Sequence, residues 1–133
     1  MLEKLHHIGM VVRDLDQALT LYEGIYGIKP SLVYESPHAK AKIAFLPIGK
    51  FRVELIQPLD AESAAGRFLG KRGEGIHHIA FAVEDIDECL SELARKGIQL
   101  IDKKSRKVRE NERVGFLNPK STHGVLTELI QED

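Results

Sequence analysis

An α+β fold made of two tandem βαβββ modules is predicted by three features of this chain. Residues 76–90 repeat the pattern of residues 5–19, and both stretches place two adjacent histidines in an apolar strand. Each half also closes on the same four residues, Glu-Leu-Ile-Gln, at 54–57 and at 128–131. Between these ends, apolar residues recur first at helical spacing and then in short strand-length runs. The second half of the chain therefore duplicates the first.

The composition agrees with one globular domain. A chain of 133 residues can bury one core but is short for two independent ones. The net charge of −1 gives no reason to expect nucleic acid or an anionic membrane as a partner. The single cysteine, Cys89, excludes an internal disulfide and favours a reducing, cytoplasmic location. Charges at Glu3 and Lys4, and the lack of a long apolar run, argue against a signal peptide and a membrane span.

Each module is expected to open with a buried strand followed by an amphipathic helix. Residues 5–13 are apolar on both faces and stop at Asp14. Asp14 with Gln17, and Asp85 with Glu88, have the spacing of a capping box at the start of a helix. Apolar stripes at helical spacing follow, and glycines stand where the helices should end in a positive-φ conformation. The stripes are Leu15, Ala18, Leu19 and Tyr22, and Ile86, Cys89, Leu90, Leu93 and Ala94, with Gly27 and Gly97 as the terminal glycines.

Cys89 occupies the position in the second helix that Ala18 occupies in the first, so we interpret it as a small core residue and not as a nucleophile. Three strands should follow each helix, at 28–36, 40–47 and 51–57 and at 98–103, 112–118 and 124–131.

The stretch from Pro58 to Gly75 is predicted to join the halves through a helix from Ala61 to Gly70. We therefore expect one domain, 1–133, with a first module at 1–58, a linker helix at 59–74 and a second module at 75–133.

Four polar residues at matching places in the modules form a candidate metal site. Strand side chains alternate between faces, so His7 shares a face with Gly9, and His78 shares a face with Ala80. Small residues beside a histidine leave room for a ligand, and the closing strands should bring their glutamates to the same face. Imidazole nitrogen and carboxylate oxygen suit Zn²⁺, Co²⁺, Ni²⁺, Mn²⁺ or Fe²⁺. The predicted ligands of one divalent ion are His7, Glu54, His78 and Glu128.

The neighbouring histidines, His6 and His77, are interpreted as packed, hydrogen-bonded residues. A glutamate in an apolar strand is costly to bury without a partner, so Glu54 and Glu128 need a cation or solvent. An exposed edge strand is the alternative interpretation for these two glutamates.

Five stretches of the chain are distinctive: Leu5-His6-His7-Ile8, Glu54-Leu55-Ile56 with Pro58-Leu59, Gly75–Ala80, Phe116-Leu117-Asn118-Pro119-Lys120 and Gly124–Leu129. They resemble the vicinal oxygen chelate superfamily, which includes glyoxalase I, extradiol dioxygenases and antibiotic-resistance binding proteins, and the resemblance covers essentially the whole chain. Within this superfamily, the closest likeness is to the methylmalonyl-CoA epimerases. The resemblance implies a U-shaped, eight-stranded mixed sheet around the metal, and a homodimer is common among the relatives.

The resemblance also implies a reaction, the removal of a proton α to the carbonyl of a small acyl-thioester substrate, with Glu128 as the matching base. Lys42 stands where some epimerases carry a second glutamate, and Glu35 and His38 are the nearby substitutes. A run at 103–113 with six basic residues and no glycine replaces an expected glycine-rich loop. This run is either a solvated loop or a binding site for the phosphates of coenzyme A.

Three other functions fit parts of the same pattern. A glyoxalase-I-type lactoylglutathione lyase would use the same metal and base. An extradiol dioxygenase would use two histidines and one glutamate, so Glu54 as a ligand argues against it. A non-catalytic binding or resistance protein often lacks the metal ligands, and the presence of all four argues against that function.

Overall fold

The computed structural model describes residues 1–133 and divides them into two compact units. One unit is His7–His77, and the other combines Met1–His6 with His78–Asp133. The Glu3 amide donates to the Ala82 carbonyl at 2.9 Å, which ties the N-terminal residues to the second unit. Eight strands form a mixed sheet and run with α1 and α3 in the order βαβββ twice, and the third α-helix, α2, lies between the repeats. The predicted α+β class and the two tandem modules are therefore confirmed.

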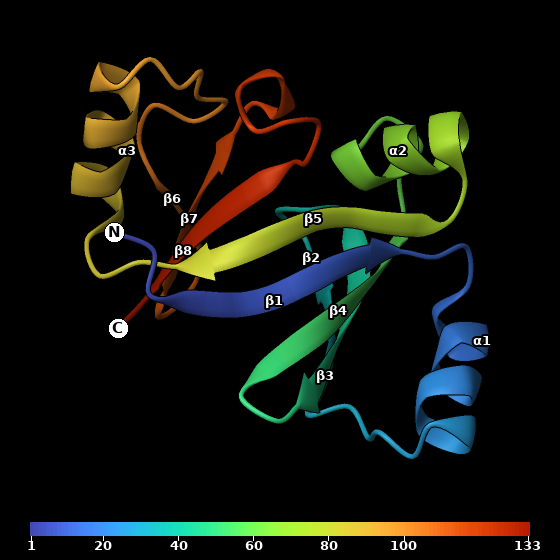
Figure 1. The fold of residues 1–133 in the computed structure, drawn as a ribbon. Coiled ribbons are helices and arrows are strands. Elements are labelled where there is room, and N and C mark those ends of the chain that lie inside the picture. Colours follow the sequence, from blue (N-terminus) through green and yellow to red (C-terminus); the bar gives the residue numbers. More distant parts are fainter. The chain divides into compact units, whose positions relative to one another are not determined.

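The strands of the first module lie in the order β2-β3-β4-β1 (Figure 1). The pairing of β1 with β4 is parallel, and β4 with β3 and β3 with β2 are antiparallel. Helix α1 contacts β3 and β4. The elements are β1 (Lys4–Val11), α1 (Leu15–Leu19), β2 (Leu32–Ser36), β3 (Ala41–Ile48) and β4 (Phe51–Pro58).

Helix α1 changes to a π-helix, η1 (Thr20–Ile25), after five residues. The helical stretch ends before Gly27, which has the predicted positive φ of 77°. Because the π-helical turn is wider than an α-turn, it shifts the side chains that follow it away from the spacing of 3.6 residues. Tyr22 still packs in the core beneath α1, as its position in the predicted stripe requires.

Alternation along the strands divides the side chains of the first unit between two apolar clusters. Met10 of β1 and Val12, directly after the strand, pack with Leu15 on the face that α1 covers. Val11 belongs to a second cluster with Phe45 and Ile56, on the other face. The bulky row of the opening strand therefore contacts the helix, as the sequence predicts, and His7 and Gly9 fall on the opposite face.

The helix between the repeats, α2 (Ala64–Arg72), begins three residues later than predicted. Ser63 is its N-cap and accepts a hydrogen bond from the Gly66 amide at 3.0 Å. Since a capping serine takes a non-helical conformation, the residues before Ser63 cannot belong to the helix. Phe68 and Leu69 of α2 pack against the cluster that contains Val11 and Ile56.

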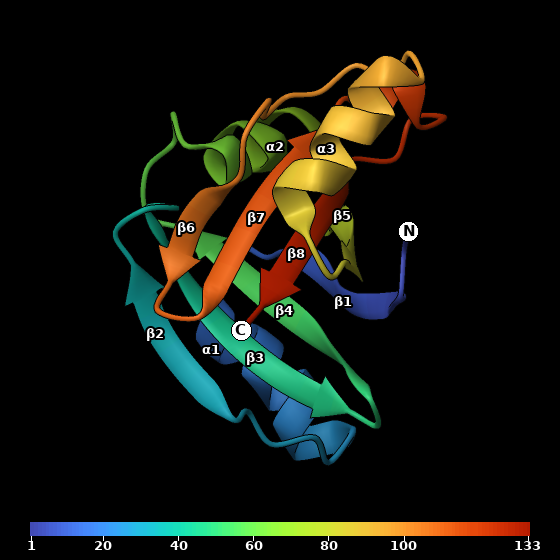
Figure 2. The ribbon, with the colours of Figure 1, turned by 90° about the vertical axis from the view of Figure 1, so that its left-hand side faces the viewer.

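The strands of the second module lie in the order β5-β8-β7-β6, and α3 runs along β7 and β8 (Figure 2). Gly97 follows the last turn of α3 with a φ of 91°, as predicted. The Ile98 amide then donates to the Leu93 carbonyl at 3.0 Å, which closes the helix. The elements are β5 (Gly75–Ala82), α3 (Ile86–Arg95), β6 (Arg106–Arg109), β7 (Glu112–Leu117) and β8 (Thr127–Glu132).

The prediction of a strand at 98–103 is wrong. The strand that pairs with β7 is β6, and Leu100 makes only an isolated bridge to Leu117. Three of the four residues of β6 are basic, so they lack the apolar alternation that marks a half-buried strand. β6 ends the strand order, and charged residues on an edge strand discourage pairing with another chain.

The repeated Glu-Leu-Ile-Gln stretches have the same structural roles in both modules. Leu55 and Leu129 are fully buried on the helix side of their strands. The glutamine of each stretch supports a helix start, since Gln57 Oε1 accepts from the Leu15 amide at 2.7 Å and Gln131 Oε1 from the Ile86 amide at 2.9 Å. No helix of the protein combines the length and apolar character needed to cross a membrane.

Candidate functional site

In the first unit, His7 of β1 and Glu54 of β4 form a buried pair. Their exposed fractions are 2% and 8%, and His7 Nδ1 lies 3.2 Å from Glu54 Oε2. On one side of β4, Glu54 stands beside Gly9 of the parallel strand β1. On the other side, it stands beside Phe45 of the antiparallel strand β3. Gly9 therefore places no side chain beside the carboxylate on β1.

Arg52 is the counter-charge of Glu54. Its Nε and Nη2 atoms lie 3.0 Å and 2.9 Å from Glu54 Oε2, and its guanidinium carbon stands 3.9 Å from the centroid of the Phe45 ring. Arg52 was not among the residues predicted for the site, although it lies only two positions before Glu54 in the same strand. Two residues apart on a strand, Arg52 and Glu54 must share a face.

In the second unit, His78 of β5 and Glu128 of β8 repeat the arrangement. Their exposed fractions are 5% and 6%, and His78 Nε2 lies 3.0 Å from Glu128 Oε2. Glu128 stands beside Ala80 on β5 and beside Phe116 on β7. The Phe116 ring meets the His78 imidazole edge to face, with centroids 5.7 Å apart. Each buried glutamate thus has a histidine, a small residue and a phenylalanine around it.

The donor set of each pair fits a divalent first-row metal ion. Imidazole nitrogen and carboxylate oxygen are its usual protein ligands, and both types are buried here with their donor atoms 3.0–3.2 Å apart. Each contact also restricts the motion of the two buried side chains before any ligand binds. The structure thus places each predicted histidine against the glutamate of its own unit.

The structure does not bring the predicted second base to the His7–Glu54 pair. Glu35 is exposed on β2 and stands opposite Lys42, three residue positions from the Phe45–Glu54 pair. His38 lies beyond it, in the turn between β2 and β3. Lys42 itself lies on the other face of β3 from Phe45, and the nearest β3 residue on the face of Glu54 is Ile43. β3 therefore supplies no carboxylate on that face.

The two neighbouring histidines have structural partners. His6 is 7% exposed, and its Nε2 lies 2.9 Å from Glu132 Oε1. The His77 ring packs edge to face on Phe68, with centroids 5.0 Å apart. Both arrangements agree with the interpretation of His6 and His77 as packed residues.

The basic run at 103–113 is a hairpin and not a loop. Arg106 of β6 pairs with Asp102 at 3.0 Å, and Arg113 of β7 donates to the Ser105 hydroxyl at 2.8 Å. Asp87 at the start of α3 accepts from both the amide and the hydroxyl of Ser105, at 2.8 Å and 3.1 Å. These bonds engage two of the six basic side chains in holding the segment against the helix.

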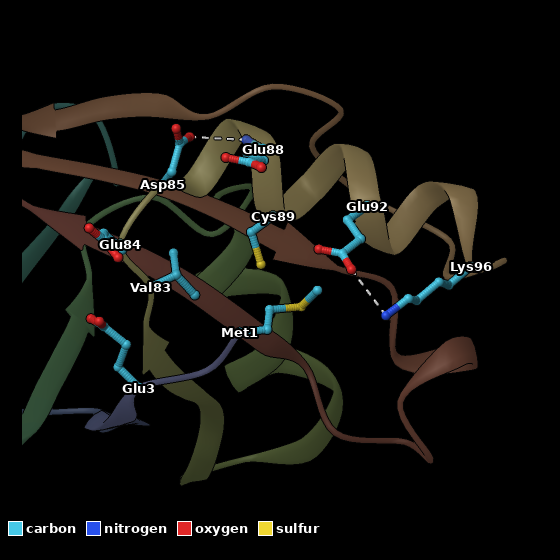
Figure 3. A pocket seen from close by; sticks show the side chains of 9 residues that line it. All are labelled: Met1, Glu3, Val83, Glu84, Asp85, Glu88, Cys89, Glu92 and Lys96. Atoms are coloured by element: carbon cyan, nitrogen blue, oxygen red, sulfur yellow. Dashed lines mark hydrogen bonds and ion pairs between the residues drawn. The ribbon is translucent and has the colours of Figure 1, made fainter.

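Cys89 lies in the wall of a hollow of about 850 Å³ beside α3 (Figure 3). Burial raises the pKa of its thiol, and the carboxylates of Glu92 and Asp85 raise it further. A thiol that resists ionisation is a poor nucleophile, which agrees with the interpretation of Cys89 as a core residue. The hollow is mainly acidic, with Glu3, Glu84, Asp85, Glu88 and Glu92 in its lining.

Comparisons with known proteins agree with these observations. The family model described as the glyoxalase/bleomycin resistance protein/dioxygenase superfamily matches residues 6–116. An uncharacterised protein of Bacillus subtilis is 35% identical over 98% of this chain and 93% of its own length. The mitochondrial methylmalonyl-CoA epimerase of Homo sapiens is 32% identical over 98% of this chain and 74% of its own length. A solved methylmalonyl-CoA epimerase in complex with methylmalonyl-CoA and NH₄⁺ is 33% identical, with a TM-score of 0.93 over 99% of this chain and 96% of that one.

The family match spans most of the chain, from His6 in β1 to Phe116 in β7. The chain belongs to the glyoxalase/bleomycin resistance protein/dioxygenase superfamily.

Proposed function

We propose that the chain is a divalent-metal-dependent isomerase that removes the proton α to the carbonyl of a small acyl-thioester, as a methylmalonyl-CoA epimerase does. The observation that carries the proposal is the pair of buried His–Glu arrangements at equivalent positions of the two modules. Relatives named as methylmalonyl-CoA epimerases, about 30% identical over nearly the whole chain, support the choice of substrate. In this proposal one ion is held by His7, Glu54, His78 and Glu128.

When bound, the ion would act as a Lewis acid toward the substrate oxygens. Glu128 is the proposed base that takes the α proton, because a buried carboxylate with a single fixed orientation can be held against a carbon acid. His78 fixes that orientation through the contact of its Nε2 with Glu128 Oε2 at 3.0 Å. Glu128 stands beside Ala80 and Phe116 and is only 6% exposed, so little water reaches its carboxylate. Glu35 and His38 stay predictions for the acid that returns the proton to the other face.

A glyoxalase-I-type lyase is the second candidate, and one observation favours it. Inversion at carbon needs one group that removes the proton from one face of the substrate and another that returns a proton to the opposite face. β3 presents Ile43 at the position where a second carboxylate would face the site. A proton shift between adjacent carbons needs only one carboxylate, which first accepts the proton and then returns it. Glu128 alone would satisfy that requirement.

Assays of the purified, metal-loaded protein in D₂O separate these candidates. With methylmalonyl-CoA, we expect deuterium at the α carbon and loss of the starting configuration, measured by NMR. With methylglyoxal and glutathione, a lyase would instead form lactoylglutathione. Binding of methylmalonyl-CoA without exchange would indicate a binding protein, and turnover of neither substrate would contradict both enzyme proposals. A homodimer and a cytoplasmic location stay predictions from the sequence and the resemblance.

A further inference from the structure

Arg52 contacts the carboxylate oxygen of Glu54 that faces His7 through two nitrogen atoms. Its Nε donates a hydrogen bond to Glu54 Oε2 at 3.0 Å, and its Nη2 forms an ion pair with the same oxygen at 2.9 Å. That oxygen lies 3.2 Å from His7 Nδ1. The Arg52 side chain is 19% exposed and the Glu54 side chain 11% exposed. The guanidinium group is thus part of the first unit's buried polar cluster and not a surface charge.

Strand register and packing fix Arg52 in this place. In β4 it stands beside His7, two residues before Glu54 and on the same face. Its guanidinium lies 3.9 Å from the centroid of the Phe45 ring, a contact that favours a cation and restricts the side chain. An arginine side chain carries a positive charge, and its planar donors suit a carboxylate. Arg52 therefore places a positive charge against Glu54.

We propose that Arg52 is a positioning residue that aims Glu54 and offsets its charge, so that a divalent ion in the site keeps a net positive charge for an anionic substrate. This inference rests on the proposed function. Two glutamate ligands neutralise a divalent ion completely, and neutral histidines add no charge. With Arg52 the cluster has a net charge of +1. The substrate class that fits is an acyl-thioester with a carboxylate on its α carbon, and a neutral chelating substrate gains less from this charge.

A spectroscopic titration tests the inference without using turnover. The protein is loaded with Co²⁺, whose visible absorption reports changes in its ligands, and is titrated with malonate, a small dicarboxylate. We expect Arg52→Met to keep the Co²⁺ stoichiometry of the original protein and to weaken malonate binding by about tenfold, the effect of one charge a few ångströms away in a polar protein site. Arg52→Lys restores the charge and should recover most of the affinity.

Lys50→Met is the matched control, because it removes the same formal charge from an exposed residue two positions away on the chain. Its malonate affinity should stay within about twofold of the original value, since solvent screens exposed charges. Circular dichroism and thermal unfolding check that each variant folds. If Arg52→Met does not fold, Arg52→Gln and Arg52→Lys replace it, with the loss of affinity expected only for Arg52→Gln.

The outcomes separate this inference from the proposed function. Equal malonate affinity in the original protein and in the uncharged Arg52 variant would overturn the role of Arg52 and leave the metal site intact. Failure of the original protein to bind Co²⁺ would overturn the proposed function. An equal loss in Arg52→Met and Arg52→Lys would show that hydrogen-bond geometry and not charge is decisive, which contradicts the charge balance proposed above.

Discussion

Glu54 and Glu128 are ionisable residues in strands whose neighbouring side chains are mostly apolar. Burying one carboxylate without compensation costs several kcal/mol, so each needs a partner within hydrogen-bond reach. The sequence predicted this need for a cation or solvent. It did not predict that Arg52 meets the need of Glu54, because alternation places a residue on a face but does not say which of its neighbours on that face it contacts.

Asp87 allows a test of charge and stability at a single residue. The Ser105 amide, followed by the Ser105 hydroxyl, Arg113 and Lys104, lowers the pKa of its carboxyl group. Since the folded state lowers this pKa, the stabilisation is complete above the pKa of the unfolded chain and is lost as the pH falls through the folded pKa. Asp87→Asn should lower the free energy of unfolding by about 1 kcal/mol at neutral pH, a value reduced for solvent exposure.

Urea unfolding of Asp87→Asn and the original protein, from about pH 7 downward, measures this effect, because the difference in stability should shrink as the pH falls through the lowered folded pKa of Asp87. Asp16→Asn is the control. Asp16 occupies the same first-turn position in α1 and shares the effect of the helix dipole. An equal loss of stability in both variants, or a loss at Asp87 that does not change with pH, would contradict the role given to Ser105.

Helices α1 and α3 begin with the same two supports, an aspartate N-cap and a glutamine from the closing strand. Asp14 and Asp85 accept from the third residue of each helix, and the glutamines accept from the first residue. The first four amides of a helix lack partners within it, so these side chains satisfy two of them at each start. The presence of the same glutamine in both modules is therefore explained by its structural role as an acceptor for the first amide of each helix.

Gln57→Ala and Gln131→Ala should each lower the free energy of unfolding by about 1 kcal/mol, because each leaves a part-buried amide without its acceptor. Chemical denaturation with the slope held in common measures the change. Gln17→Ala is the control, since the exposed side chain of this residue is not the group that Asp14 contacts. A change of less than about 0.3 kcal/mol in both glutamine variants would show that water replaces the side chain at no cost.

Two glycines of α2 should respond in opposite ways to the same substitution. A Cβ atom at Gly66 would collide with the carbonyl oxygen of Asp60 and the backbone of Ala61, whereas a Cβ atom at Gly70 meets nothing nearby. Gly66→Ala should destabilise the protein by about 2 kcal/mol or more, because backbone atoms must move. Gly70→Ala should stabilise it by about 0.5–1 kcal/mol, since alanine restricts the unfolded chain and favours the helix. Thermal unfolding of both variants checks the signs, and stabilisation by Gly66→Ala would contradict the close approach at Asp60.

Local sequence patterns predicted most helices and strands, but they failed where contacts with distant parts of the chain determine the secondary structure. Periodicity predicted α3 and its terminal Gly97 because both depend on residues close in sequence. It could not predict β6, whose basic residues form a strand only because β7 supplies hydrogen-bond partners. The π-helical turn at Thr20–Ile25 was also not predicted, because over so few residues the stripe of apolar residues is nearly the same for an α-helix and a π-helix.

At the scale of the whole molecule, the duplication predicted that each module contributes a histidine and a glutamate to the site. It did not predict which group would return the proton to the substrate. Equivalent positions in the two modules led to the four proposed ligands, and the structure gives each histidine a glutamate partner. The resemblance puts Lys42 where some epimerases carry a second glutamate, whereas Ile43 is the β3 residue on the face of Glu54. Because side chains alternate along a strand, these adjacent positions lie on opposite faces. Strand register is a tertiary property that spacing alone does not determine.

The two His–Glu pairs lie in separate compact units, so the number of ions bound distinguishes one shared site from two independent ones. If one ion uses all four ligands, the original protein binds one ion per chain, and His7→Ala and His78→Ala each abolish that binding. Calorimetric titration with Co²⁺ and elemental analysis after dialysis measure the stoichiometry. Saturation at about 100 times the dissociation constant should also raise the stability of the original protein by about 2.7 kcal/mol, and of neither variant.

His77→Ala is the matched control, because His77 adjoins His78 and packs on Phe68. It should keep one ion per chain, even if the loss of the aromatic contact lowers the unfolding temperature. Two ions per chain in the original protein, with each alanine variant at His7 or His78 losing only one, would show that each unit binds its own ion. In that case the charge balance proposed for Arg52 would apply to the first unit alone, and Glu128 would act beside a different ion from the one next to Glu54. Full occupancy in His7→Ala or His78→Ala would remove that histidine from the ligand set.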